Sequence, residues 1–142
     1  MTATEVDTMQ LAMSQIGWLP ALACALSAFV LGGLWYGPLF RHAWCREAGV
    51  QPDGAAKHPR HTFATAFVAA FVAAVAFDWL LGPAPGLRAA VIDGFLVGLA
   101  LVAMSFAINY AFARRSLKLW LIDGGYHTLQ FTLYGLIIGL WQ

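Results

Sequence analysis

Four long apolar runs make up most of the chain and decide what it can fold into. Each is about as long as the roughly 20 residues with which an α-helix crosses the hydrocarbon core of a bilayer. Residues 62–81 include one ionisable side chain in twenty positions, whereas a helix on a soluble protein carries a polar outer face. We therefore predict an all-α fold, an integral membrane four-helix transmembrane bundle that forms a single domain over residues 1–142. The predicted spans are residues 16–40, 62–81, 87–113 and 118–141.

The composition agrees with a lipid environment and excludes several classes of protein. Apolar residues make up 61% of the chain and charged residues 11%, against about a quarter charged in a soluble domain. The net charge is +1, and the cations lie beside apolar runs, so no nucleic-acid partner is expected. The sequence has no nucleophile elbow, phosphate-binding glycine loop or zinc-protease motif. We therefore expect neither enzyme activity nor a cofactor.

The basic residues predict how the spans are oriented. Seven of the eight Lys and Arg residues fall in the loops 41–61 and 114–118, and Arg88 alone falls on the other side. Short loops rich in Lys and Arg stay in the cytoplasm. We expect both of these loops to be cytoplasmic and both termini to lie on the outer side of a bacterial inner membrane.

Small residues recur every four positions on three of the predicted helices. Such spacing lets the backbones of two membrane helices approach closely. We expect these faces to pack the bundle internally, and the alternative is that they join two copies of the chain into a homo-oligomer. The residues are Ala66, Ala70 and Ala74, then Gly94 and Gly98, then Gly135 and Gly139.

A polar stripe runs along the last predicted span. Asp123, His127, Gln130 and Tyr134 are spaced at 0, 4, 7 and 11 positions, which places them on one helix face. Ionisable residues inside a span are costly and often functional, so Asp123 and His127 are a candidate proton-binding pair. In the alternative, Asp123 pairs with a basic residue of loop 114–118 and His127 only holds helices together.

Further polar and aromatic residues converge on the same cytoplasmic half and define a candidate pocket. We expect it to bind or pass a small solute, a lipid headgroup or a proton, the identity of the ligand being open. The alternative is a structural or accessory membrane subunit. We also expect the His127 ring to face other helices, near Asn109 or the Trp35–Tyr36 end of the first span. The candidate pocket residues are Trp35, Tyr36, Asn109, Asp123, Tyr126, His127 and Gln130.

Two carboxylates lie toward the opposite, outer end. Asp78 is near the end of the second span and Asp93 is about 9 Å into the third. The short turn between these spans could bring both to similar depth, where two carboxylates would share a proton or bind a cation. Alternatively, each pairs separately or reaches interfacial water.

A group of possible metal ligands lies in the first loop. His42 and Cys45 are followed by His58 and His61, and these residue types and spacings resemble a zinc site. Histidines beside Arg and Lys at a membrane surface are ordinary, however, so we expect no metal.

Two stretches resemble a bacterial membrane family catalogued as domain of unknown function 1761. They are residues 33–40, with the sequence GLWYGPLF, and residues 108–127, which run from Ile108 to His127. The resemblance implies four transmembrane helices with a shared motif at their inner ends, and it implies no activity. In such proteins the Asp123 position is either acid or amide, and the loop histidines lie outside the pattern.

Overall fold

All regular structure in the described part of the chain is helical. The computed structural model describes residues 16–51 and 58–141, and the predicted all-α fold is confirmed for these ranges. The helices are α2 (Trp18–Leu34), the π-helical η1 (Trp35–Leu39), α3 (Arg41–Ala48), α5 (Arg60–Leu81), α6 (Leu87–Leu96), the π-helical η2 (Val97–Ala103), α7 (Met104–Phe112) and α8 (Leu117–Trp141).

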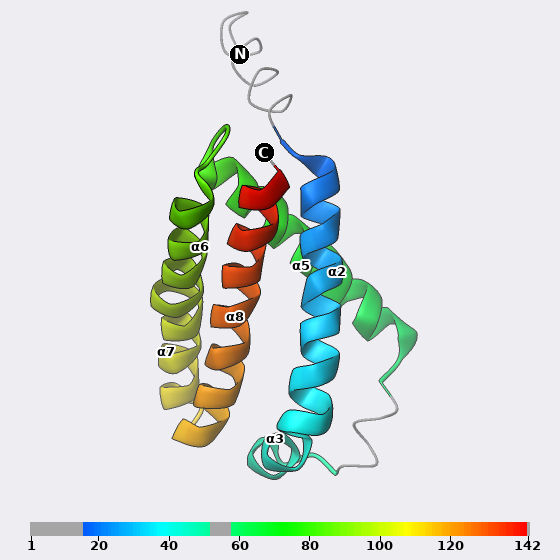
Figure 1. The fold of residues 1–142 in the computed structure, drawn as a ribbon. Coiled ribbons are helices and arrows are strands. Elements are labelled where there is room, and N and C mark those ends of the chain that lie inside the picture. The colour runs from blue at the N-terminus through cyan, green and yellow to red at the C-terminus, as the bar shows by residue number, and fades with distance from the viewer. Residues whose placement is uncertain (1–15, 52–57, 142) are drawn as a thin grey trace, which may run out of the picture.

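The α8 helix and its two antiparallel neighbours form a bundle. In Figure 1, α8 lies between α2 on one side and the continuous α6–η2–α7 rod on the other, while α5 crosses behind at a steep angle. The start of α2 and the end of α8 lie at the same end of the bundle, and α3 lies at the opposite end together with the α7–α8 turn. Of the described Lys and Arg residues, only Arg88 belongs to a helix that begins at the end where α2 starts, because it lies in the first turn of α6.

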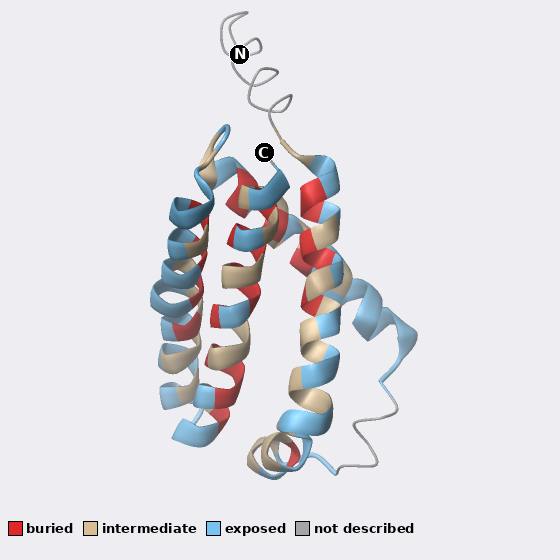
Figure 2. Cartoon of the chain, in the orientation of Figure 1, coloured by how far each residue is buried: buried red, intermediate tan, exposed pale blue. Residues whose placement is uncertain are grey.

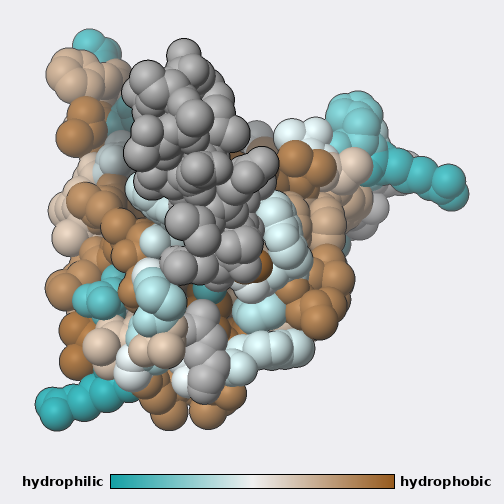
Figure 3. Space-filling view, turned by 90° about the horizontal axis from the view of Figure 1, so that it is seen from above, coloured by the Kyte–Doolittle hydropathy of each residue, from teal (hydrophilic) through white to brown (hydrophobic). Residues whose placement is uncertain are grey.

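Within the described residues, three helices are long and apolar enough to cross a bilayer, where the sequence predicted four. They are Trp18–Leu39, Arg60–Leu81 and Leu87–Phe112, and in Figure 3 apolar side chains lie along much of the visible rim of the molecule. The fourth predicted span does form a continuous helix, α8. Its polar stripe makes it less apolar than the others, and it carries more buried residues than any other described helix. Because neighbouring helices cover so much of α8, it has less need of a lipid-compatible surface.

Glycines bring α6 and α8 into backbone contact. A Cβ added at Gly94 would collide with the backbone of Phe131, and one added at Gly135 would collide with the backbone of Ala90. Gly98 and Gly139 meet the opposite backbone in the same way. The small-residue faces of the third and fourth predicted spans therefore pack against each other within one chain.

The first predicted span, residues 16–40, is helical over Trp18–Leu39 but changes its helix type before it ends. Its regular α-helix stops at Leu34, and the chain passes through η1, where Gly37 has the non-helical angles φ −91° and ψ −105°. Pro38 follows and has no backbone N–H to donate to a preceding turn. The chain then turns into α3, so the predicted loop 41–61 begins with a short helix.

The second predicted span leaves the bundle along its length. Ala70, Ala74 and Phe77 are buried, but Ala66 is exposed although the sequence grouped it with Ala70 and Ala74. Figure 2 shows the first part of α5 projecting from the bundle with its surface exposed. The small-residue face of α5 thus packs only where α5 crosses α2.

Because glycines let the α6 and α8 backbones touch, adding one methyl group at this contact should lower the stability of the protein. We expect Gly135→Ala to force the two backbones apart and to destabilise the protein by about 1 to 3 kcal/mol, as overpacking does in other cores. The measurement is the thermal unfolding midpoint in detergent. Gly33→Ala is the matched control, because a Cβ at Gly33 meets nothing within 4 Å and alanine favours the helix. Equal midpoints for the two variants would contradict the proposed packing.

Candidate functional site

The carboxylate of Asp123 accepts hydrogen bonds from three other elements. The Tyr36 hydroxyl in η1 donates to Oδ1 at 2.8 Å, and the Trp44 indole in α3 donates to the same oxygen at 3.1 Å. The Tyr110 hydroxyl in α7 donates to Oδ2 at 2.7 Å. Asp123 is only 7% exposed. One side chain of α8 therefore joins η1, α3 and α7 at the end of the bundle where α8 begins.

All three donors to Asp123 are neutral groups. A carboxylate offers about four lone-pair positions, so three donors nearly saturate it. The sequence left open whether Asp123 pairs with His127 or with a basic residue of loop 114–118. In the described part of the chain it forms a hydrogen bond with neither.

His127 belongs to a separate chain of hydrogen bonds. Its Nδ1 lies 2.9 Å from Oε1 of Gln130, whose Nε2 donates to the Tyr134 hydroxyl at 2.7 Å. The Tyr134 hydroxyl in turn donates to the backbone carbonyl of Ala70 in α5 at 3.2 Å. The stripe predicted from the sequence is thus confirmed as one face for these three residues. The chain ends on a backbone carbonyl, so it ties α8 to α5.

The His127 ring faces another helix, although its neighbour differs from the predicted ones. It stacks on Phe106 of α7, with ring centroids 5.0 Å apart and planes 26° from parallel. It also meets the edge of the Tyr126 ring. Asn109, which the sequence placed in the pocket, is exposed on α7. Because its side chain is exposed, Asn109 does not line the predicted pocket.

Two tryptophans fasten α8 to its neighbours through their indole N–H groups. Trp35 donates to the carbonyl of Ile122 at 2.9 Å, and Trp120 donates to the carbonyl of Ala103 at 2.7 Å. Tyr126 makes a similar contact, donating to the Ala28 carbonyl at 3.0 Å. With their N–H groups occupied, both indoles present apolar rings to the space between them.

That space is an apolar groove of about 300 Å³ on the outside of α8. Its volume is at the small end of the range for ligand pockets. Leu121 and Gly125 each lie two residues from Asp123, which is about 200° of rotation around the helix, so the groove and the Asp123 cluster occupy opposite faces. The lining residues are Trp35, Leu99, Ala103, Trp120, Leu121, Gly124, Gly125, Thr128 and Leu129.

The two glycines give the groove its depth. An added Cβ at Gly125 would lie 3.2 Å from the Trp35 ring, and one at Gly124 would lie 3.1 Å from Cβ of Ala103. Leu99, Leu121 and Leu129 at the edges are all exposed. The groove therefore opens sideways, toward what would be lipid, and it can hold an apolar chain.

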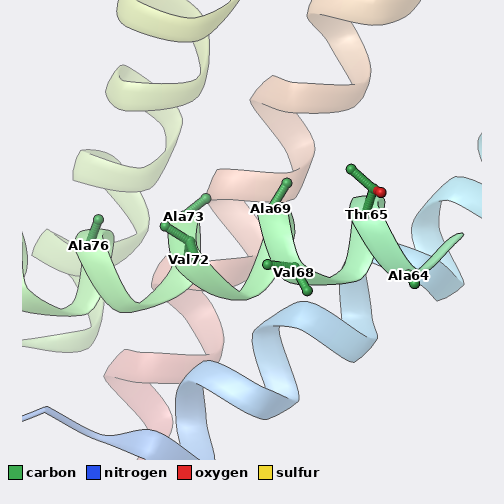
Figure 4. Close-up of a pocket in the computed structure, with 7 residues that line it drawn as sticks. All are labelled: Ala64, Thr65, Val68, Ala69, Val72, Ala73 and Ala76. Atoms are coloured by element: carbon green, nitrogen blue, oxygen red, sulfur yellow. The ribbon is translucent and has the colours of Figure 1, made fainter. Parts of the chain in front are cut away.

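A second hollow, of about 680 Å³, runs along the projecting part of α5. Figure 4 shows Thr65, Ala69, Ala73 and Ala76 pointing to one side of this helix. Every residue that lines the hollow comes from α5 itself. It is therefore an open apolar helix face, and it lacks the opposed walls of a binding cavity.

The two outer carboxylates are not joined. Asp78 is 3% exposed, and its Oδ2 accepts the backbone N–H of Gly17 at 2.8 Å, while its Oδ1 has no hydrogen-bond partner within residues 16–51 and 58–141. Asp93 lies exposed on α6. Because Gly17 precedes α2, Asp78 places a negative charge at the positive end of that helix. This is a capping role, in place of the shared proton or cation considered above.

The loop residues considered as zinc ligands do not gather into one site within residues 16–51 and 58–141. Cys45 is buried in α3, while His42 is exposed on the same helix. His58 packs edge-on against Phe63. No group of three metal-binding side chains occurs among these described residues.

The predictions from the sequence missed several residues that contact Asp123, His127 or the groove. Trp44 lies beyond the predicted end of the first span, and Phe106 and Trp120 looked like ordinary apolar or interfacial residues. A signal was present for Trp44, since it is a polar-tipped aromatic close to a helix breaker, where a buried acid could find a donor. Only the turn at Gly37, however, brings Trp44 back over α8.

The comparison with protein families decides what this chain is related to. The model of the family described as "Protein of unknown function (DUF1761)" matches residues 19–139. The chain belongs to this family. The match confirms the resemblance seen in the sequence, and it covers α2 through nearly all of α8. Neither the curated proteins nor the solved structures give a significant match.

Because three hydrogen bonds nearly satisfy the Asp123 carboxylate, we expect its donors to stabilise the fold. We expect Tyr110→Phe and Tyr36→Phe each to cost about 1.5 to 3 kcal/mol, the usual contribution of a hydrogen bond to a charged group. Tyr126→Phe is the matched control and should cost less, because its hydroxyl donates to a neutral carbonyl. The measurement is thermal unfolding in detergent. If the three variants lose the same stability, the carboxylate has no special structural role.

Proposed function

We propose that this protein is a small integral protein of the bacterial inner membrane that binds an apolar chain in the groove between Trp35 and Trp120. The observation that carries the proposal is the groove itself, which has opposed walls from η1, η2 and α8 and is open on the lipid side. The polar residues of the inner half then have a structural role, since Asp123 and Gln130 are already hydrogen-bonded within the protein. This replaces the polar ligand expected from the sequence with an apolar one.

Four spans with both termini outside fit this proposal. The α8 helix has 25 residues, enough at about 1.5 Å each to cross a core of about 30 Å. The positive-inside rule places α3 and the α7–α8 turn in the cytoplasm. The groove then lies in the cytoplasmic half, at the depth of the inner leaflet.

A second candidate function is that of an accessory subunit whose role is structural. It is favoured by the same saturation of Asp123, because a carboxylate with three donors holds helices together whether or not a ligand binds. A subunit of this kind would need no groove, and filling the groove would then have no effect.

The orientation can be tested with single cysteines. In a background without Cys24 and Cys45, we expect a cysteine at Ala84 to react with an impermeant maleimide added to whole cells. A cysteine at Gln51 should react only after the cells are opened, because the seven-to-one charge distribution places it inside. The reverse pattern would invert the proposed orientation.

Binding in the groove can be tested by filling it. We expect Leu129→Trp to block the groove and to lower, by at least several-fold, crosslinking of α8 by phosphatidylcholine that carries a diazirine on its acyl chain. Leu136→Trp is the matched control, since Leu129 and Leu136 are seven residues apart on one helix face and are 42% and 37% exposed. The labelled residues are identified by peptide mass spectrometry. Equal labelling around residues 121–129 in both variants would favour the accessory subunit.

A further inference from the structure

We propose that the occupant of the groove is an anionic phospholipid whose phosphate is held by Lys118 together with Arg114 and Arg115. This inference rests on the proposed function, and it specifies the class of ligand. It is carried by the juxtaposition of an apolar groove with three cations at its inner end.

Lys118 lies on the same face of α8 as the groove. Lys118, Leu121, Gly125 and Leu129 are spaced at 0, 3, 7 and 11 positions, which is one helical stripe. The last three line the groove. Lys118 therefore stands one turn beyond the inner end of the groove, where the headgroup of an inner-leaflet lipid would lie while its acyl chain occupied the groove.

Arg114 and Arg115 add positive charge close to Lys118. Arg114 and Arg115 are exposed in the turn that leads into α8, and Arg114 adopts the left-handed conformation with φ 53°. None of these three cations forms a salt bridge with a described residue. The sequence has no Asp or Glu between Asp93 and Asp123, and Asp123 itself is covered on the opposite face. The inner end of the groove is therefore positive and complementary to a phosphate.

The first turn of α8 also favours binding of an anion. Ser116 accepts the N–H of Leu119 through its Oγ at 3.1 Å, and the first turn of a helix carries a partial positive charge. The apolar groove favours a lipid over free phosphate, because free phosphate has no apolar part to contact the walls of the groove. Trp35 and Trp120 also suit the level of lipid headgroups, where indole rings are enriched.

The test compares two lipids that differ only in the headgroup. The protein is placed in nanodiscs that contain trace phosphatidylglycerol or phosphatidylcholine, each with the same diazirine-bearing acyl chain. We expect phosphatidylglycerol to label residues 121–129 several-fold more than phosphatidylcholine. Lys118→Gln should reduce this preference about five-fold, since a Lys near an anionic lipid surface contributes about 1 kcal/mol. Arg88→Gln is the matched control, and it should leave the preference unchanged.

The outcomes separate this inference from the proposed function. Equal labelling by the two lipids in the unmodified protein overturns the anionic ligand and leaves the groove as a binding site. Labelling by neither lipid overturns both. If Lys118→Gln loses labelling by both lipids, the double variant Arg114→Gln with Arg115→Gln decides the matter. A lower preference for phosphatidylglycerol in that variant supports the inference, and an unchanged preference overturns it.

Discussion

The polar face of α8 is the constraint on which the rest of the structure depends. In the hydrocarbon core no water satisfies a buried polar group, so every such group needs a partner within the protein. Asp123 and Gln130 meet this requirement with donors and acceptors on η1, α3, α7 and α8 itself, and Tyr134 meets it on α5. A helix with these needs must lie at the centre, and the more apolar helices must surround it.

Different forces hold the two halves of the bundle. Toward the end where α6 begins, Gly94 and Gly135 let α6 and α8 touch through their backbones, and dispersion between closely packed atoms supplies the attraction. Toward the end that holds α3, aromatic side chains also join the helices by hydrogen bonds to backbone carbonyls. The change occurs near Gly98, whose added Cβ would still meet the backbone of Thr128. The groove lies beside this contact, where Gly124 and Gly125 leave its floor without side chains.

Hydropathy and spacing in the sequence predicted the positions of the helices better than the direction in which each side chain points. The apolar runs, the α6–α8 glycine faces and the stripe from His127 to Tyr134 were predictable, because each depends on local periodicity. Asn109 and Asp93 were placed at plausible depths but are exposed, since the rotation of a helix depends on what packs against it. The turn at Gly37 and the outward course of α5 were not predictable from hydropathy, which records how apolar a segment is and not where its axis points.

The groove and the hydrogen bonds of Asp123 are linked through two adjacent residues, Trp35 and Tyr36. Tyr36 donates to Asp123, while the adjacent Trp35 donates to the Ile122 carbonyl and forms one wall of the groove. The two side chains reach different sides of α8 because they stand at the start of the π-helical turn, just before the chain departs from helical geometry at Gly37. The hydrogen bond of Tyr36 therefore fixes the backbone that carries Trp35. The buried acid positions the groove without lining it, so a structural role for Asp123 and a binding role for the groove follow from the same arrangement.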